Sequence, residues 1–575
     1  MKKSIICLFL CFLVIGCKKN PLDITPDGKI SMKDVFSDQV RTEAFLNTIY
    51  GFIPYYYTAY QEWSFLAGAT DEAQDAEVGN NPGVVWDWIT GRLTPSFDPL
   101  AAGVDGTVNQ YPTFWSGIGY ANIFLQNIDN ATVKGEQFKS RLKGEAQLLR
   151  AFFYLELVKK YGAMPVADKP FDNDFNYTGL KRGTFQECVD FIVKDCDAVI
   201  ANPNMPLRIT IENERVRFSK AIAYAIKSEA LLYNASPLWN PTNDAAKWQA
   251  AAAGSKEALT ALTAGGNYKL ADDYGNYFLN NADFAVVPRD RETIYERRSA
   301  FPGSVMNVPS KGGIWKLGAC PSQELVDSYD MQATGEPAIT GYEDADHLKP
   351  IINPASGYDP AKPYEGRDPR FYATVWYNGA LYDNINGNVH TVATYAGGGD
   401  QLIKSPPNRT NTHTGYYLRK FLDPKLPTGQ DQVSGWKKYR LAEIYLNLAE
   451  AENEANGPTA VALDAVNAIR RRAQMPDLGG LDKEALRERI RRERRVELAI
   501  EEHRFWDVRR WKILDKTDKL VTGMEVIKNP DNSFSYKRFV TERRNAWQDK
   551  FRIFPIPIAD ASIVPDFSEN QNPGW

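Results

Sequence analysis

Helical periodicity constrains this chain more than any other feature of its sequence. Apolar residues recur at three- and four-residue steps over the segments 34–53, 111–130, 138–161, 184–201, 219–236 and 245–264. Several of these segments have suitable ends: Thr184 with Glu187 forms a capping box, Ser219 suits an N-cap, and Gly162 suits a helix stop before Pro165. The pattern predicts a mostly α-helical fold.

A later stretch indicates how such helices pair. In "YRLAEIYLNLAEAENEANGPTAVALDAVNAIRRRA" (439–473), Ala alternates with large apolar residues, so two helices can approach closely. Gly457 is expected to end the first helix and Pro458 to begin the second. Tetratricopeptide repeats use such pairs, although their consensus is degenerate here. Segment 285–435, rich in Gly, Pro, Asn and Tyr, predicts loops and small strands on this helical frame.

The first residues read as an export signal. Lys2 and Lys3 precede an apolar run, Ile5 to Ile15, that is too short to span a bilayer as a mature helix. The run ends in Val-Ile-Gly-Cys, which resembles a bacterial lipobox, and Cys17 would then become the acylated first residue. A lipid at Cys17 would hold the protein to a membrane.

No linker composition divides the remaining chain. We therefore expect three parts: a lipoprotein signal peptide (1–16), a lipid-anchored tether (17–32), and a single domain (33–575) with a helix-pair-rich part, about 33–284, and a loop-rich and C-terminal helical part, about 285–575.

Charge and metal-binding residues exclude several classes of function. Loss of Lys2 and Lys3 leaves 66 basic residues against 72 acidic ones, a balance that does not attract polyanions. The cysteines that remain beyond Cys17 are odd in number and predict no disulfide framework: Cys188, Cys196 and Cys320. The four histidines show no metal-ligand spacing. We expect no nucleic-acid partner, no metal and no cofactor.

One stretch tests that exclusion. "IRRERRVELAIEEHRFWDVRRWK" (490–512) interleaves arginines with aromatic residues, as nucleic-acid-binding segments do. It also supplies acidic partners at helical spacing, for example Arg489 with Glu493 and Asp507 with Arg510. Exposed pairs of this kind contribute only about 0.3–0.5 kcal/mol each. We interpret the stretch as a scaffold helix with locally paired surface charges.

Landmarks along nearly the whole chain carry a family resemblance. They include "FWSGIGYANIFLQNID" (114–129), "EAQLLRAFFYLELVKKYGAMPV" (145–166), "PSQELVDSYDM" (321–331), "EGRDPRFYATV" (365–375) and "RRERRVELAIEEHRFWDVRRW" (491–511). In these motifs and their order the chain resembles SusD/RagB-type outer-membrane lipoproteins. It departs from the family at Glu502, where Gly is common, so a different local backbone is expected there.

The resemblance implies a SusD-like single domain built on tetratricopeptide-like helix pairs, with a loop-rich binding face and small β elements. It implies no catalytic activity. Family members cap a SusC-type TonB-dependent barrel at the outer membrane and deliver glycans to it, so the expected partners are such a barrel and an oligosaccharide. Delivery of peptides, as in RagB-type members, is the alternative.

Aromatic-rich loops are where sugar binding is expected, because a sugar ring has an apolar C–H face and hydroxyl edges. Two segments, 71–97 and 295–316, combine such aromatics with polar residues. The candidate ligand-binding residues are Asp71, Asn80, Asn81, Trp86, Trp88, Arg92, Tyr295 and Trp315. Trp86 and Trp88 alternate as on a strand, so one of them is expected to face the core. A protein–protein scaffold would not explain these loops.

An enzyme is the remote alternative. Neighbouring carboxylates such as Asp71 with Glu72, or Glu292 with Glu296, are imaginable as the acid and base of a glycoside hydrolase. The sequence contains no GxSxG elbow and no Gly-rich phosphate loop to support catalysis. A structural calcium ion in the acidic loop 341–346 is imaginable but not predicted, since EF-hand spacing is absent.

Overall fold

The computed structural model describes residues 30–55, 65–75, 84–101, 110–172, 174–280, 288–301, 319–383, 387–404, 411–423, 425 and 432–575. The helices of its N-terminal part confirm the predicted periodicity: α1 (Met32–Phe36), α2 (Gln39–Gly51), α4 (Gln110–Asn127), α5 (Glu136–Tyr161), α6 (Phe185–Ala201), α7 (Lys220–Ala235) and α8 (Ala245–Thr263). Segment 34–53 forms two helices rather than one, because the Asp38 side chain accepts a hydrogen bond from the Arg41 N–H and caps α2.

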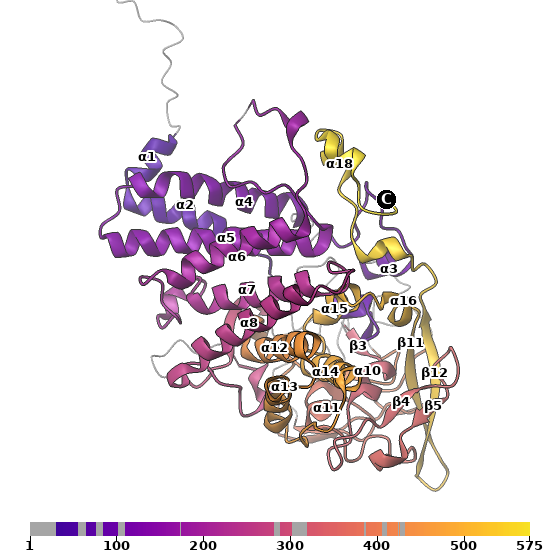
Figure 1. The fold of residues 1–575 in the computed structure, drawn as a ribbon. Helices are drawn as coiled ribbons and strands as arrows, with labels where there is room; N and C mark the ends of the chain where they lie inside the picture. The colour runs from indigo at the N-terminus through magenta and orange to yellow at the C-terminus, as the bar shows by residue number, and fades with distance from the viewer. Residues whose placement is uncertain are drawn as a thin grey trace, which may run out of the picture.

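These helices stack in chain order, α4 on α5, α5 on α6, α6 on α7 and α7 on α8. The stack continues with α12 (Leu441–Asn456), which packs on α8, and then with α13 (Ala460–Arg472) and α14 (Lys483–Glu497) (Figure 1). The helical frame is thus continuous in space although residues 264–440 interrupt it in the sequence. This arrangement confirms the mostly α-helical, helix-pair fold.

Local signals set most helix ends. Thr184 and Glu187 form the expected capping box, and Gly162 and Gly457 end α5 and α12 with positive φ angles of 75° and 81°. The prediction for Pro458 was wrong: the Thr459 side chain caps the next helix, which begins at Ala460. A side-chain hydroxyl that accepts an otherwise unpaired N–H outweighs the preference of proline for the first turn.

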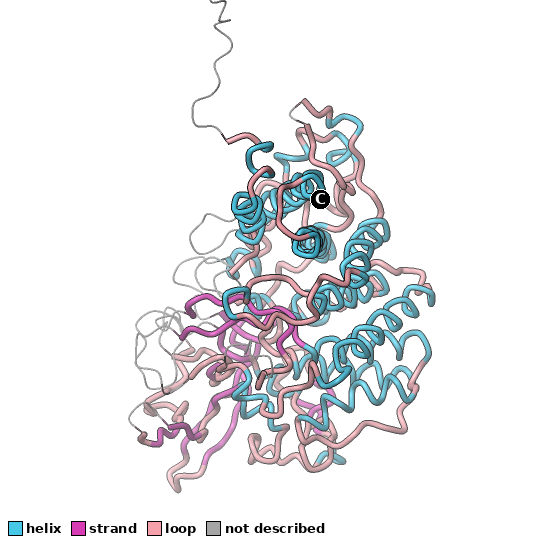
Figure 2. The backbone as a smooth tube through the Cα atoms, turned by 90° about the vertical axis from the view of Figure 1, so that its left-hand side faces the viewer, coloured by secondary structure: helices cyan, strands magenta, loops and turns pink. Residues whose placement is uncertain are grey.

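Strands occur as antiparallel pairs in the part of the chain that is described, and no larger sheet forms there. The pairs are β1 (Ala73–Asp75) with β3 (Ala319–Pro321), β2 (Thr293–Phe301) with β10 (Gln432–Arg440), β4 (Ile339–Tyr342) with β5 (Pro350–Ile352), β6 (Val375–Trp376) with β9 (Tyr417–Leu418), β7 (Leu381–Asp383) with β8 (Val389–Thr391), and β11 (Leu520–Lys528) with β12 (Phe534–Arg543). Figure 2 shows them gathered on one side of the helical frame.

Shorter helices complete the described part of the fold. They are α3 (Val84–Ile89), α9 (Tyr274–Tyr277), α10 (Gln323–Ser328), α11 (Pro369–Thr374), α15 (His503–Arg510), α16 (Leu514–Thr517), α17 (Ile558–Ala561) and α18 (Pro565–Glu569). One hydrophobic cluster extends from Phe36 to Phe567 and includes residues from both parts of the chain. Cys188, Cys196 and Cys320 are buried free thiols.

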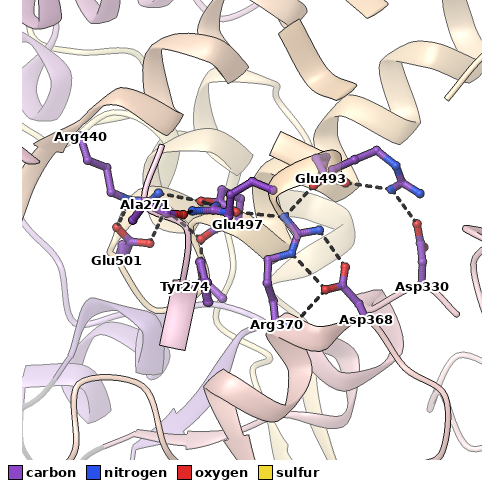
Figure 3. Close-up of polar contacts among 12 residues, drawn as sticks. Ala271, Tyr274, Asp330, Asp368, Arg370, Arg440, Glu493, Glu497 and Glu501 are labelled. Carbon is purple, nitrogen blue, oxygen red and sulfur yellow. Dashed lines mark hydrogen bonds and ion pairs between the residues drawn. The ribbon is translucent and has the colours of Figure 1, made fainter. Parts of the chain in front are cut away.

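The predicted scaffold helix forms α14 and α15, and most of its charged side chains are buried or partly buried rather than exposed. Arg440, at the end of β10, donates hydrogen bonds to Glu497 at 2.6 Å, to Glu501 at 2.7 Å and to Glu292 at 2.8 Å (Figure 3). Glu497 also accepts from Arg370 at 2.9 Å and pairs with Arg472. The network therefore ties α11, α13, α14 and the end of β10 together.

The prediction of local surface pairs was largely wrong. Asp507 does pair with Arg510 at 2.8 Å, but Arg489 pairs with Asp330, and Glu493 pairs with Arg370 and Arg470. These acidic and basic residues find long-range partners because α14 is enclosed by neighbouring elements. Removing one partner from such a buried pair costs about 3–5 kcal/mol, well above the value for an exposed pair.

Glu502 has a backbone conformation that suits glycine, and the difference from the family expected there stays a prediction. It occupies the N-cap position of α15 in the left-handed region, with φ 68° and ψ 0°. Its carboxyl group is buried, and one carboxylate oxygen, Oε1, has no hydrogen-bond partner. Burial, and then the negative charge of Glu156, raise the pKa of Glu502 to about 8, although Lys438 opposes the shift.

Candidate functional site

The pairing of β1 with β3 brings the first predicted binding segment, 71–97, beside residues 319–321, which follow the second predicted segment, 295–316, in the sequence. Asp75 lies opposite Ala319, and Gln74 lies opposite Cys320. The Ser322 hydroxyl donates to the Asp71 carbonyl at 2.6 Å and fixes this junction. Asp75, the last described residue before 76–83, therefore lies beside Ala319, the first described residue after 302–318. Asn80, Asn81 and Trp315 themselves lie outside the described residues.

Trp86 and Trp88 lie on a helix, α3, instead of the alternating strand that was expected. Residues two apart on a helix point about 200° apart, so the prediction that one of them faces the core is still confirmed. Trp88 is 3% exposed and stacks on Phe554 at 5.3 Å with the Arg509 guanidinium at 4.7 Å from its ring. Trp86 is 36% exposed and presents its ring at the surface.

Arg92 lies at the surface shortly after α3. Its guanidinium donates to the Asp87 carboxylate at 2.6 Å and lies 5.4 Å from the centre of the Phe97 ring. The Arg92 side chain remains 57% exposed. Of the predicted residues that are described, Trp86 and Arg92 are thus the two that remain exposed. Both follow β1 in the sequence.

Tyr295 and Asp71 are enclosed by the fold. Tyr295, on β2, packs edge-on against Phe218 at 5.0 Å. Asp71 accepts two hydrogen bonds from Arg504 at 2.8 Å and pairs with Arg495 at 3.1 Å. Although burial alone would raise the pKa of Asp71, the two arginines hold it well below its usual range. Together with Trp88, these side chains support the face from within and do not contribute exposed surface to it.

The structure adds one exposed aromatic residue that was not predicted. Tyr55 is 48% exposed, and the Arg297 guanidinium of β2 lies 4.2 Å from its ring centre. The tyrosine run that begins at Tyr55 was a usable signal, since three consecutive aromatic side chains cannot all point into a core. Tyr55 places a flat ring at the edge of the β2–β10 pair.

The carboxylates considered for catalysis are all buried. Glu292 pairs with Arg440 at 2.8 Å, and Glu296 pairs with Arg298 at 2.7 Å. Glu72 lies beside Asp71; burial first, and then the charge of Asp71, raise its pKa to about 8 against the opposing arginines. An acid and a base that cleave a glycoside must flank an accessible bond. These buried carboxylates instead make internal contacts that stabilise the fold.

The acidic loop 341–346 also uses its carboxylates internally. Asp346 pairs with Arg543 at 2.8 Å, and Asp344 accepts the backbone N–H of Lys349 at 2.8 Å. Within the described residues, no group of three or more His, Cys, Asp or Glu side chains is arranged to hold a metal ion. None of the described helices is long and apolar enough to cross a bilayer. Cys17 lies outside the described residues.

Comparison with known proteins agrees with this architecture. Residues 284–575 match the SusD family, and residues 22–232 match a family described as starch-binding and associating with the outer membrane. "SusD-like protein P38" of Formosa agariphila is 24% identical over 457 residues, which cover 75% of each chain. "SusD-like protein P25" of the same organism is 36% identical over 137 residues, or 23% of each chain.

Solved structures show the same fold. A SusD-like protein from Bacteroides fragilis is 28% identical, with a TM-score of 0.75 and coverage of 94% of this chain and 98% of its own. A laminarin-binding SusD-like protein is 21% identical, with a TM-score of 0.60 over 94% of this chain and 100% of its own, and supports the fold. From the family match over residues 284–575 and these likenesses, the chain belongs to the SusD family.

Proposed function

We propose that this protein is a cell-surface glycan-binding lipoprotein that captures oligosaccharides and delivers them to a SusC-type TonB-dependent transporter. The observation that carries the proposal is the β1–β3 register, which places the first aromatic-rich segment, 71–97, beside residues 319–321, shortly after the second one, 295–316, in the sequence. Exposed rings at Trp86 and Tyr55 supply flat apolar surface near those segments in the sequence. Membership of the SusD family supports the same class of function.

A glycan suits such a face for physical reasons. Stacking on Trp or Tyr removes the apolar C–H face of a sugar from water, while nearby Asp, Asn and Arg side chains orient its hydroxyl groups. Shallow, hydrated sites of this kind bind weakly, with dissociation constants on the order of micromolar to millimolar, or about −8 to −4 kcal/mol. Weak binding suits a protein that must release its ligand into a channel.

Binding without turnover is part of the proposal. The carboxylate pairs considered for hydrolysis lie in the core, and three of their four members are held in ion pairs: Asp71, Glu292 and Glu296. A carboxylate fixed in this way is not available to protonate a leaving group or to attack a sugar. The residues thus support a binding role in preference to glycoside hydrolysis.

Anchoring at the outer membrane completes the proposal. Cys17 would carry the lipid, and residues 17–32 would tether the folded part so that it faces the cell exterior beside the transporter. Stable interfaces bury roughly 1,200–2,000 Å² in total. Mild detergent extraction followed by native mass spectrometry should recover this protein together with its barrel partner. Recovery of the barrel consistently without it would contradict the partnership.

Ligand binding can be tested with two matched tryptophan variants. Trp315→Ala should weaken binding of the cognate oligosaccharide by about 1–3 kcal/mol, by analogy with stacking in other shallow sites, and should leave folding nearly intact. Trp511→Ala is the contrasting variant and should destabilise the fold. The Trp511 side chain is buried, and its indole N–H donates to Glu450 at 2.7 Å. If titration detects tight peptide binding and no glycan binding, the peptide alternative replaces the proposal.

A further inference from the structure

A groove lies away from the predicted face, between α4, the segment 165–180 and the C-terminal helices α17 and α18. It encloses about 270 Å³, slightly below the usual range for ligand pockets of about 300–1,000 Å³. Tyr111, Trp115 and Asn122 line one wall, and Phe171 and Tyr177 line the other. Figure 1 shows α18 at the top of the molecule, close to the end of the α4–α5 pair. A groove of this size accommodates a single ring, and the rest of a longer ligand would lie outside it.

Neighbouring rings brace the aromatic side chains of both walls. Trp115, half-buried on α4, meets Tyr111 edge-on at 6.5 Å and Tyr154 edge-on at 6.1 Å. Tyr177, half-buried at the start of a short 3₁₀ helix, meets Phe175 edge-on at 5.0 Å. Each ring is therefore held in place before a ligand arrives, which lowers the entropic cost of binding.

Buried hydrogen bonds hold the wall made by segment 165–180 against α4. The Asn122 amide donates to the carbonyls of Ala167 at 3.0 Å and of Lys169 at 3.1 Å. Arg150 donates to the Asn122 side-chain oxygen at 2.7 Å, and its guanidinium is itself paired with Asp195 at 2.8 Å. The groove is a preformed feature, because α4, α5 and α6 all contribute to this network.

A carboxylate at the edge of the groove lacks a cationic partner. Among the described residues, Asp560 makes no ion pair and its side chain accepts no hydrogen bond from another residue, and burial raises its pKa. Asp560 and Tyr111 line the same groove, and the charge of Asp560 adds to burial in raising the pKa of Tyr111. A partly desolvated carboxylate beside aromatic rings is suited to accept hydrogen bonds from the hydroxyl groups of a ligand.

Two glycines on α4 have different surroundings. A Cβ atom at Gly117 would lie 2.5 Å from the Phe153 ring, so helix packing requires glycine there. A Cβ atom at Gly119 would meet nothing within 4 Å, and Gly119 lines the groove. Packing therefore does not explain the glycine at 119, whereas an open groove does, because any side chain at that position would enter it.

We infer that this groove is a second carbohydrate subsite, which takes one neutral hexose ring of an oligosaccharide. The ring packs against Trp115 and Tyr177, and its hydroxyl groups donate to the Asp560 carboxylate. The inference shares the ligand class of the proposed function but uses different residues, so each can fail without the other. The subsite gives the protein a second contact with the same polymer, or a contact with a separate polymer at the surface.

The test locates binding by hydrogen–deuterium exchange of the full mature protein. The probes are maltoheptaose, laminariheptaose, and cello- and manno-oligosaccharides, each at millimolar concentration. At least one probe should slow exchange in residues 163–180 of the wild type. Gly119→Leu should abolish that protection because leucine fills the groove, and Trp115→Ala should weaken it by about tenfold or more in ligand concentration.

Matched variants separate blockage from general damage. Gly51→Leu places the same side chain at another glycine that has nothing within 4 Å of its Cβ position, and Tyr120→Ala removes an exposed ring from α4 outside the groove lining. Both should keep the protection. If probes bind the wild type but residues 163–180 exchange equally with and without them, or if Gly119→Leu retains the protection, the subsite is refuted while the proposed function stands. If no probe binds at all, both fail.

Discussion

Replacing Glu502 with glycine should change the stability of the protein in a pH-dependent way. Two features of Glu502 are unfavourable: the left-handed backbone at φ 68°, and a buried carboxyl group with an unpartnered oxygen. A non-glycine residue in this region costs about 1–2 kcal/mol. Glycine removes both unfavourable features. It also removes the carboxylate that accepts the Leu66 N–H, and it increases the conformational entropy of the unfolded chain. These two effects together lower the stability by about 2 kcal/mol.

The pH dependence follows from the pKa. The folded-state pKa of Glu502 is about 8, whereas the unfolded value is about 4.3. Because the folded state holds the proton more tightly, the wild-type stability associated with this group is present below about pH 4.3 and is lost as pH rises towards 8. By linkage the loss reaches about 3–4 kcal/mol at pH 7. Glu502→Gly should therefore be nearly neutral at pH 4.5 and stabilising by about 3 kcal/mol at pH 7.

Urea unfolding between pH 4.5 and pH 8 measures this difference. Glu502→Ala separates the two contributions, since it removes the carboxyl group but keeps the strained backbone, and should be about 1 kcal/mol less stable than the glycine variant at every pH. Asn532→Gly is the control, because Asn532 has a φ of 66° in an exposed turn and should show no pH dependence. If the difference in unfolding free energy between wild type and Glu502→Gly is constant across this pH range, the Glu502 carboxyl group is not the source of the pH dependence.

Three further predictions follow from the fold and the tether. Arg440→Met should destabilise the protein by about 3–5 kcal/mol, because it leaves Glu292, Glu497 and Glu501 without a central partner; Arg471→Met, which breaks an exposed pair with Asp477, should cost less than about 1 kcal/mol in the same urea experiment. Trp511→Ala should cost about 3–5 kcal/mol through the cavity that it leaves, and an unchanged unfolding midpoint would contradict its core position. Cys17→Ala should leave the protein uncleaved or released from membranes, and a wild-type mature N-terminus other than Cys17, found by mass spectrometry, would disprove lipidation at this residue.

The helical frame was predictable because its signals are local. Periodicity and caps such as Thr184 and Gly162 operate within one or two turns, so the sequence alone locates these helices. The pairing of β1 with β3 joins residues nearly 250 positions apart, and no local pattern encodes such a contact. The helical frame was therefore clear from the sequence, whereas the arrangement of the strand pairs on it was not.

The sequence could not determine which of the candidate site residues are exposed. Of those that the structure describes, Trp86 and Arg92 are exposed. Tyr295 is buried because Phe218, 77 positions earlier, covers its ring, and Asp71 is buried because Arg504 reaches it from the far end of the chain. Exposure depends on such distant partners. For the same reason the charges of α14 could be recognised as paired, but their partners could not be named.

One measurement tests directly whether this protein binds glycan and whether it leaves the glycan uncleaved. Purified mature protein is titrated by calorimetry with a panel of defined oligosaccharides, and each sample is afterwards examined by chromatography for shorter products. We predict saturable binding of at least one glycan, with a dissociation constant on the order of micromolar to millimolar that weakens in Trp86→Ala and Trp315→Ala, and recovery of the ligand intact. Cleavage that scales with protein concentration and disappears on replacement of a single carboxylate would contradict the account.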